Sequence, residues 1–114
     1  YSVRAKDSTE ADQLLKDISM LENLGCFGIV LEKIPAFLAK KATKSVKIPI
    51  IGIGAGPSVD GQVLVLHDML GMNKEFSPRF LRRYSDLDQI IRKAVNQYAE
   101  DVKSENFPSD KEQY

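Results

Sequence analysis

Two short apolar runs, separated by a helical segment, constrain this chain more than any other feature of its sequence. Residues 27–31 and 50–53 are continuously apolar apart from glycine and contain several β-branched side chains. Such runs are typical of strands buried on both faces of a parallel sheet. Pro35 suits the first turn of a helix over residues 36–42. A strand, a crossover helix and a second strand predict an α/β fold with a parallel sheet.

Apolar residues recur with a helical period over residues 11–21. We expect this helix to start at Thr9, where Asp12 completes a capping box, and to stop near Leu24. Gly25 follows at the place of a left-handed C-cap glycine.

The second half of the chain predicts three more elements. Residues 63–66 form a third apolar run and indicate a further strand ending in His67-Asp68. Residues 72–83 mix proline, phenylalanine and basic residues without a period, which favours an ordered loop or a short helix. Residues 87–102 carry a helical apolar stripe, the simplest reading of which is a core-facing helix, and Ser85-Asp86 is its expected cap.

Composition excludes several classes of function. The 16 basic residues balance 16 acidic ones among 114 residues, so the charge pattern of a nucleic-acid binder is missing. The longest apolar stretch is far shorter than the roughly 20 residues of a membrane-spanning helix, and we expect a soluble protein. One cysteine, Cys26, and one histidine, His67, leave no internal disulfide, cysteine-based zinc site or multi-histidine site within this chain. Residues 1–114 are expected to form one segment with a polar tail at 103–114, where only Phe107-Pro108 is expected to dock.

The predicted sheet is incomplete. Three apolar parallel strands leave two open edges and need cover on both faces, which these helices supply only in part. We infer that the missing surface belongs to more chain or to another subunit.

Glu32 is the first candidate for catalysis because it lies directly after the first apolar run. In parallel α/β folds active sites are built at the carboxyl ends of the strands, and a carboxylate there can serve as a general base. The alternative is a glutamate that begins a turn and pairs with Lys33 or Lys40. Position alone favours this second interpretation.

Three further features could bind a ligand. The glycines at residues 52, 54 and 56 could admit an anion to the backbone or relieve crowding where a strand ends. His67-Asp68 could form an acid–base pair, or the histidine could be satisfied by backbone groups. The third feature is a group of arginines before the last helix: Arg79, Arg82 and Arg83. These could grip a carboxylate or phosphate, or form a solvated or intersubunit surface.

Three longer motifs carry a resemblance to a known family. They are Val-Leu-Glu-Lys-Ile-Pro at residues 30–35, Ile-Pro-Ile-Ile-Gly-Ile-Gly-Ala-Gly at 48–56 and Asp-Gly-Gln-Val-Leu-Val-Leu-His-Asp at 60–68. In this order and spacing they closely resemble ketopantoate hydroxymethyltransferase, also called 3-methyl-2-oxobutanoate hydroxymethyltransferase. The resemblance covers the chain from Tyr1 to the Phe107-Pro108 tail.

The resemblance implies a (β/α)8 TIM barrel of the phosphoenolpyruvate/pyruvate superfamily. Such barrels take about 250 residues, so this chain of 114 residues would be the C-terminal part, with about three strands and their helices. The three strands would be the sixth, seventh and eighth. This arrangement would account for the open sheet edges.

The resemblance also implies an activity in pantothenate and coenzyme A synthesis. The family transfers a hydroxymethyl group from 5,10-methylenetetrahydrofolate to α-ketoisovalerate, which is bound to Mg2+, and forms ketopantoate. Its general base is the glutamate of the V-L-E-x-x-P motif, which is Glu32 here. No segment matches the family's metal-ligand motifs, so the Mg2+ ligands are expected outside this segment and the chain alone is not expected to be active.

The family further implies a cytoplasmic homo-oligomer, commonly a decamer, and residues 79–84 are our candidate for a contact in it. The single cysteine agrees with a reducing compartment. Two alternatives stay open. One is a non-catalytic fragment that only packs against the missing barrel strands. The other is a different barrel enzyme of the same superfamily, with a phosphorylated ligand at the glycine loop.

Overall fold

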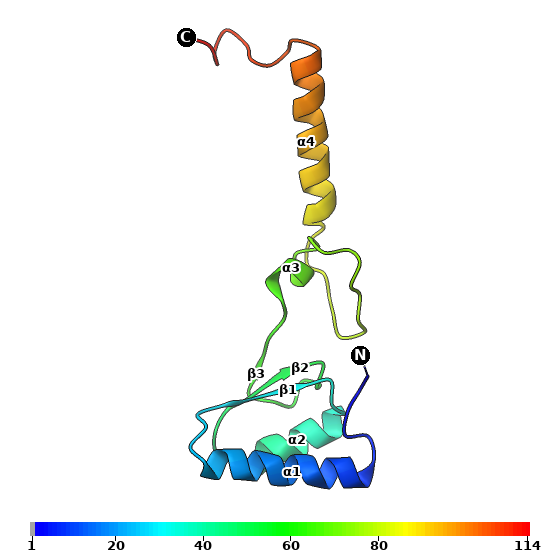
Figure 1. Ribbon diagram of the computed structural model, residues 1–114, viewed down its shortest axis with the longest axis vertical. Coiled ribbons are helices and arrows are strands. Elements are labelled where there is room, and N and C mark those ends of the chain that lie inside the picture. Colours follow the sequence, from blue (N-terminus) through cyan, green and yellow to red (C-terminus); the bar gives the residue numbers. More distant parts are fainter. Residues whose placement is uncertain (1) are drawn as a thin grey trace. The chain divides into compact units, whose positions relative to one another are not determined.

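The computed structural model describes residues 2–114, which divide into two compact units (Figure 1). The first unit runs to Leu64 and includes Pro78–Leu81. The second comprises Val65–Ser77 and Arg82–Tyr114. Each unit has its own internal contacts.

The first unit is a small α/β layer. Its elements in chain order are α1 (Ser8–Asn23), β1 (Ile29–Glu32), α2 (Ala36–Ser45), β2 (Ile50–Ile53) and β3 (Gly61–Gln62). The strands lie in the order β1-β2-β3 and both pairings are parallel. Helices α1 and α2 lie on the same face of the sheet (Figure 1). The α/β class with a parallel sheet is therefore confirmed.

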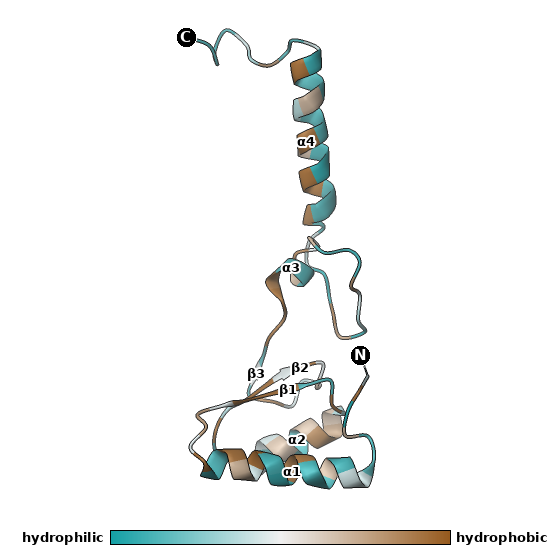
Figure 2. Ribbon diagram, viewed as in Figure 1, coloured by the Kyte–Doolittle hydropathy of each residue, from teal (hydrophilic) through white to brown (hydrophobic). Residues whose placement is uncertain are grey.

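The core of this unit lies between the sheet and the two helices. Ile29 is the register partner of Ile50, and Leu31 is the partner of Gly52, so these residues share the helix-facing side of the sheet. Ile50 is fully buried there. The buried cluster consists of Ile18, Leu31, Ile34, Ala39, Ala42, Ile50 and Ala55. Strands β1 and β2 accordingly carry apolar colour in Figure 2.

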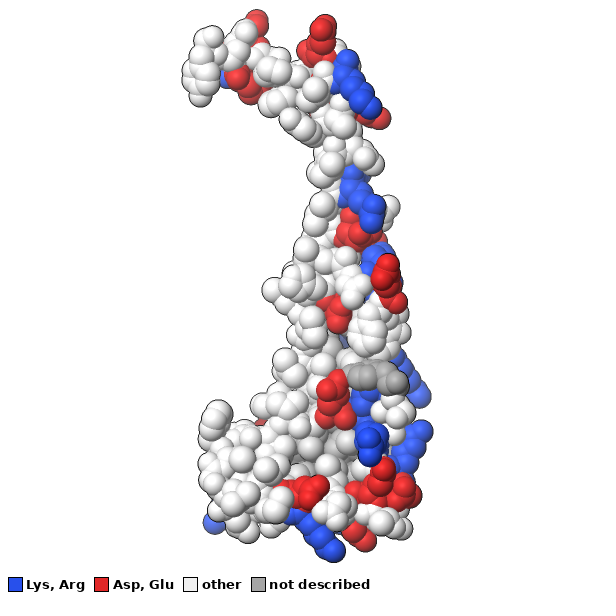
Figure 3. Space-filling model, viewed as in Figure 1, with Lys and Arg blue, Asp and Glu red and all other residues white. Residues whose placement is uncertain are grey.

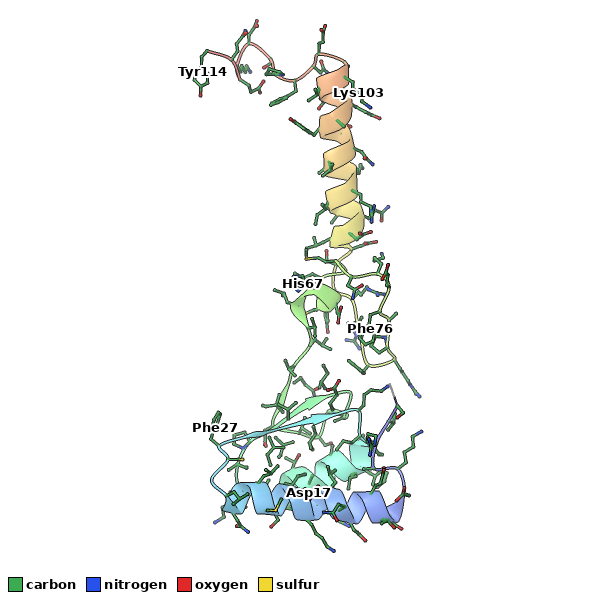
Figure 4. All side chains as sticks on the ribbon, in the orientation of Figure 1. Asp17, Phe27, His67, Phe76, Lys103 and Tyr114 are labelled. Atoms are coloured by element: carbon green, nitrogen blue, oxygen red, sulfur yellow. The ribbon has the colours of Figure 1, made fainter. Side chains whose placement is uncertain are left out.

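The other face of β1 is open, which corrects the expectation of a strand buried on both sides. Leu31 is 4% exposed whereas Val30 is 61% exposed. Phe27 lies outside the strand and is 93% exposed, and its ring projects away from α1 (Figure 4). Within the first unit, α1 and α2 cover only one face of the sheet. An apolar run in the sequence does not indicate which of its residues lie on the covered face.

The N-cap of helix α1 lies two residues earlier than the predicted cap at Thr9. Asp7 is its N-cap, and the Oδ1 atom of Asp7 accepts a hydrogen bond from the Glu10 backbone N–H at 2.8 Å. The predicted capping box of Thr9 and Asp12 is wrong, because Thr9 already lies in the first helical turn. Gly25 has a φ of +94°, which confirms the left-handed residue after the helix.

Replacing Asp7 by alanine is expected to lower the free energy of unfolding by about 1 kcal/mol, because the Glu10 N–H loses its acceptor. Urea denaturation of the full-length protein measures this change. Asp12→Ala is the matched control, since Asp12 lies inside α1 and caps nothing. A loss at position 7 no larger than the loss at position 12 would contradict the assigned cap.

The third strand is shorter and earlier than predicted. β3 pairs through Gly61 and Gln62, and the last ladder bond runs from the Val63 N–H to the Gly52 oxygen at 3.1 Å. The predicted strand over residues 63–66 is therefore wrong. The strand β2 ends at Ile53 and offers no further partner, so the apolar run leaves the sheet. Its last residue, Leu66, begins the short helix α3 (Leu66–Met69) in the second unit.

In the second unit the predicted last helix is confirmed as α4 (Leu87–Lys103). Asp86 is its N-cap, and its Oδ1 atom accepts from the Gln89 N–H at 3.4 Å. The Lys74 ammonium lies 2.8 Å from the same oxygen. The hydrogen bond from Lys74 lowers the pKa of Asp86 below its ordinary value.

The loop before α4 is ordered, as predicted, and Arg83 holds it together. Its guanidinium donates to the carbonyl oxygens of Phe76 and Asn73 at 2.9 and 3.3 Å, and to Ser77 Oγ at 3.3 Å. The Tyr84 N–H donates to the Met69 oxygen at 2.7 Å. Arg83 therefore closes the loop instead of standing free for an anion.

Helix α4 buries no residue, so the expectation of a core-facing helix is not met within residues 2–114. Its apolar residues run along one side (Figure 2). The Phe107 ring meets the Tyr98 ring edge-on with centroids 5.6 Å apart, so the expected docking of Phe107 takes place on this chain's own last helix. Positive and negative side chains are mixed on the visible surface (Figure 3). Among the described residues, no helix is long and apolar enough to span a bilayer.

Candidate functional site

Glu32 is the last residue of β1 and lies at the carboxyl end of the sheet. Its register partner is Ile53, the last residue of β2. Because side chains alternate along a strand, Glu32 shares a face with Val30, opposite the buried Leu31. The Glu32 side chain is therefore exposed on the face of the sheet that α1 and α2 do not cover.

The chain turns sharply after Glu32. Lys33 has a φ of +50°, a left-handed conformation that is uncommon for a side chain of this size. Its N–H donates to the Ile53 oxygen at 2.9 Å, and its own oxygen accepts from the Arg4 N–H at 2.9 Å. Two neighbouring segments thus hold the backbone immediately after Glu32. Residues in such sparsely populated conformations cluster at active sites and ligand-binding segments.

The glycine loop follows β2 at the same end of the sheet. Gly56 has a φ of +79°, and a Cβ atom there would overlap the Cβ atom of Ala36, the first residue of α2. The Gln62 Nε2 group donates to the Gly56 oxygen at 2.8 Å. A Cβ on Gly52 would lie 3.0 Å from Val59 Cγ2. These contacts support the interpretation in which the glycines relieve crowding where the strand ends.

Phe80 reaches this end of the sheet from far along the chain. A Cβ on Gly54 would lie only 2.8 Å from Phe80 Cδ1 and 3.0 Å from Phe80 Cγ. The ring therefore rests directly on the Gly54 backbone, one residue beyond the partner of Glu32. Sequence reasoning did not single out Phe80. In the sequence, the glycine at position 54 indicates that a neighbouring group comes close to the backbone there. It does not indicate that this group is the Phe80 ring.

Most of the remaining candidates belong to the second unit, whereas Arg79 belongs to the first unit together with Glu32. His67 and Asp68 belong to α3 in the second unit, and not to the end of a strand as predicted. Asp68 is 8% exposed and accepts from Asn73 Nδ2 at 3.3 Å, which gives it a structural role. Of the arginines, Arg83 closes its own loop, as described above.

The family resemblance implies a bound Mg2+ ion, and the described residues limit where its ligands can lie. This ion prefers oxygen ligands in octahedral geometry, often including one or two carboxylates. Within residues 2–114, no three histidine, cysteine, aspartate or glutamate side chains come together in a group that could hold a metal ion. The residues of this chain thus do not fit a complete magnesium site.

Comparison with known proteins gives a consistent result along the chain. The family model described as ketopantoate hydroxymethyltransferase matches residues 1–110. A Flavobacterium johnsoniae protein named 3-methyl-2-oxobutanoate hydroxymethyltransferase is 67% identical over all 114 residues. Proteins of the same name from Christiangramia forsetii and Parabacteroides distasonis are 62% and 60% identical over the same length.

The chain spans 42% of the length of each of these three relatives. A chain that spans this share of its relatives would form only part of a barrel. A partial barrel agrees with a sheet that has one face left uncovered by α1 and α2. The expectation that the segment is the C-terminal part stays a prediction, because the shared length does not decide which part it is. The match does not favour the alternative of a non-catalytic packing piece. Because the family model and these relatives cover the chain almost completely, the chain belongs to the ketopantoate hydroxymethyltransferase family.

Proposed function

We propose that the protein containing this chain transfers a hydroxymethyl group from 5,10-methylenetetrahydrofolate to α-ketoisovalerate, forming ketopantoate, with Glu32 as the general base. The observation that carries the proposal is the place of Glu32. Glu32 is the last residue of β1, at the carboxyl end of a parallel sheet and inside the motif shared with the family. Barrel enzymes build their active sites at the carboxyl ends of their strands.

The chemistry requires one proton to leave the substrate. In α-ketoisovalerate the carbon next to the ketone carbonyl carries a single hydrogen, and the carbonyl can accept the electron pair when this hydrogen leaves as a proton. Glu32 would take the proton onto a carboxylate oxygen. The carbon would then form a bond to the methylene carbon of the folate, and both bonds from that methylene carbon to the folate nitrogens would break. Water would supply the hydroxyl group, and tetrahydrofolate would leave with two protons on its nitrogens, one returned from Glu32 and one from the same water.

The surroundings of Glu32 support this role. Val30 precedes it on the same face and Ile53 lies beside it, so the carboxylate stands next to apolar side chains. Such a surface suits the branched alkyl group of the keto acid. The backbone after Glu32 is held by the hydrogen bonds of Lys33 to Ile53 and Arg4, which fixes the direction of the strand end.

Magnesium has no part in the steps assigned to this chain. We propose that its ligands come from the rest of the protein, because the described residues do not assemble a ligand group. The role given to Glu32 is confined to proton removal and can be tested separately from metal binding.

The first experiment is an assay of the full-length protein with α-ketoisovalerate and 5,10-methylenetetrahydrofolate. Mass spectrometry is expected to detect ketopantoate, and its formation is expected to require both substrates. A second measurement follows exchange of the substrate hydrogen in deuterated water without the folate. A protein that forms no ketopantoate under these conditions would rule out the proposed reaction.

A further inference from the structure

We propose that Phe80 is a specificity-determining residue, whose ring forms an apolar wall against which the alkyl group of the 2-oxo acid lies. The inference rests on the proposed function and concerns the same site. Segment Pro78–Leu81 belongs to the first unit, although the residues on both sides of it belong to the second.

The segment presents Phe80 at the end of the sheet where Glu32 lies. The Leu81 N–H donates to the Pro78 oxygen at 3.0 Å, which closes a tight turn with Phe80 inside it. The ring rests on Gly54, with 2.8 Å between Phe80 Cδ1 and the position of a Cβ atom there. Any side chain at position 54 would displace the ring, so this glycine permits the contact.

Phe80 is close enough to Glu32 to touch the same small substrate. Glu32 pairs with Ile53, the last residue of β2, and Gly54 follows directly after that strand. With strands about 4.8 Å apart and about 3.3 Å per residue, the ring lies roughly 10 Å or less from the Glu32 backbone. The Glu32 side chain together with a five-carbon acid can span this distance.

The chemistry of the surroundings agrees with an alkyl-binding wall. Phe80 is only half-buried, so part of its ring stays accessible. Val30 and Ile53 bring further apolar surface to the same end of the sheet. A carboxylate base next to an apolar wall suits a substrate with its reactive carbon between a carbonyl and an alkyl group.

The test compares two substrates in the full-length protein. One is α-ketoisovalerate and the other is 3-methyl-2-oxopentanoate, which is longer by one methylene and keeps the reactive hydrogen. The ratio of their kcat/KM values is measured for the wild type, Phe80→Ala and Phe80→Leu. Phe76→Ala is the matched control, because it removes the same kind of ring from a residue that belongs to the second unit.

We expect Phe80→Ala to shift the ratio toward the longer acid by about tenfold or more, chiefly through KM, as one methylene in an apolar pocket does. Phe80→Leu is expected to shift it less in the same direction, and Phe76→Ala is expected to leave it unchanged. If Phe80→Ala fails to fold by circular dichroism, Phe80→Leu carries the test. A purely structural role would lower kcat/KM for both acids alike and keep the ratio.

The outcomes separate the two proposals. A wild type that forms ketopantoate, with variants at position 80 whose ratio stays within twofold of it, would overturn the role of Phe80 and leave the reaction intact. A wild type that forms no hydroxymethyl product from either acid would overturn the proposed function, and the role of Phe80 with it.

Discussion

In the full-length protein, Glu32→Gln is expected to lower kcat by about 10²- to 10⁴-fold, the usual contribution of a general base. Glutamine keeps the size of the side chain, but its amide cannot take up the substrate proton. Because Glu32 is exposed at the end of β1 and outside the core, the fold is expected to persist. Binding of α-ketoisovalerate, measured by calorimetry, is expected to change little.

Two further measurements make this prediction specific. The variant is expected to lose exchange of the substrate hydrogen in deuterated water, because exchange needs the same proton removal without the folate. Glu100→Gln is the matched control, since it makes the same chemical change on the exposed surface of α4. Wild-type turnover in Glu32→Gln would remove Glu32 from the role of base.

Gly56→Ala is expected to lower the free energy of unfolding by about 3 kcal/mol, since left-handed strain of about 1–2 kcal/mol adds to overpacking of about 1–3 kcal/mol. The φ of Gly56 is +79°, which penalises any side chain. A Cβ there would also overlap the Cβ of Ala36 and lie 3.1 Å from its Cα atom. Since backbone is involved, rotation of a side chain cannot relieve the contact.

Denaturation in urea measures this loss, and Gly25→Ala separates its two causes. Gly25 has a φ of +94° but no atom within 4 Å of an added Cβ, so alanine there brings backbone strain without a clash. Equal losses at positions 25 and 56 would show that the contact with Ala36 contributes nothing. Ala36 follows Glu32 by four residues, so we also expect kcat to fall in Gly56→Ala.

Local chemistry made several elements predictable from the sequence. The N-cap Asp86 and the left-handed Gly25 were expected where they are found, because both depend on a few neighbouring residues. The predicted N-cap of α1 was wrong. Asp7, Thr9 and Asp12 are all chemically able to cap a helix, and only the backbone conformation shows that Asp7 does so.

Features that depend on distant partners were not predictable in this way. The apolar run at residues 63–66 has the composition of a strand, yet β2 ends too early to pair with it. Val30 is apolar but exposed, because α1 and α2 lie on the other face of the sheet.

The sequence by itself determined the alternation of helices and parallel strands, and the place of Glu32 at a strand end within a recognisable motif. Hydrogen-bonding preferences and periodicity act over a few residues, so they can be read along the chain. Only the tertiary structure showed which face of the sheet is covered and that Phe80 rests on Gly54. Such contacts join residues far apart in the chain, and local propensity carries no information about which distant side chain will fill a given space.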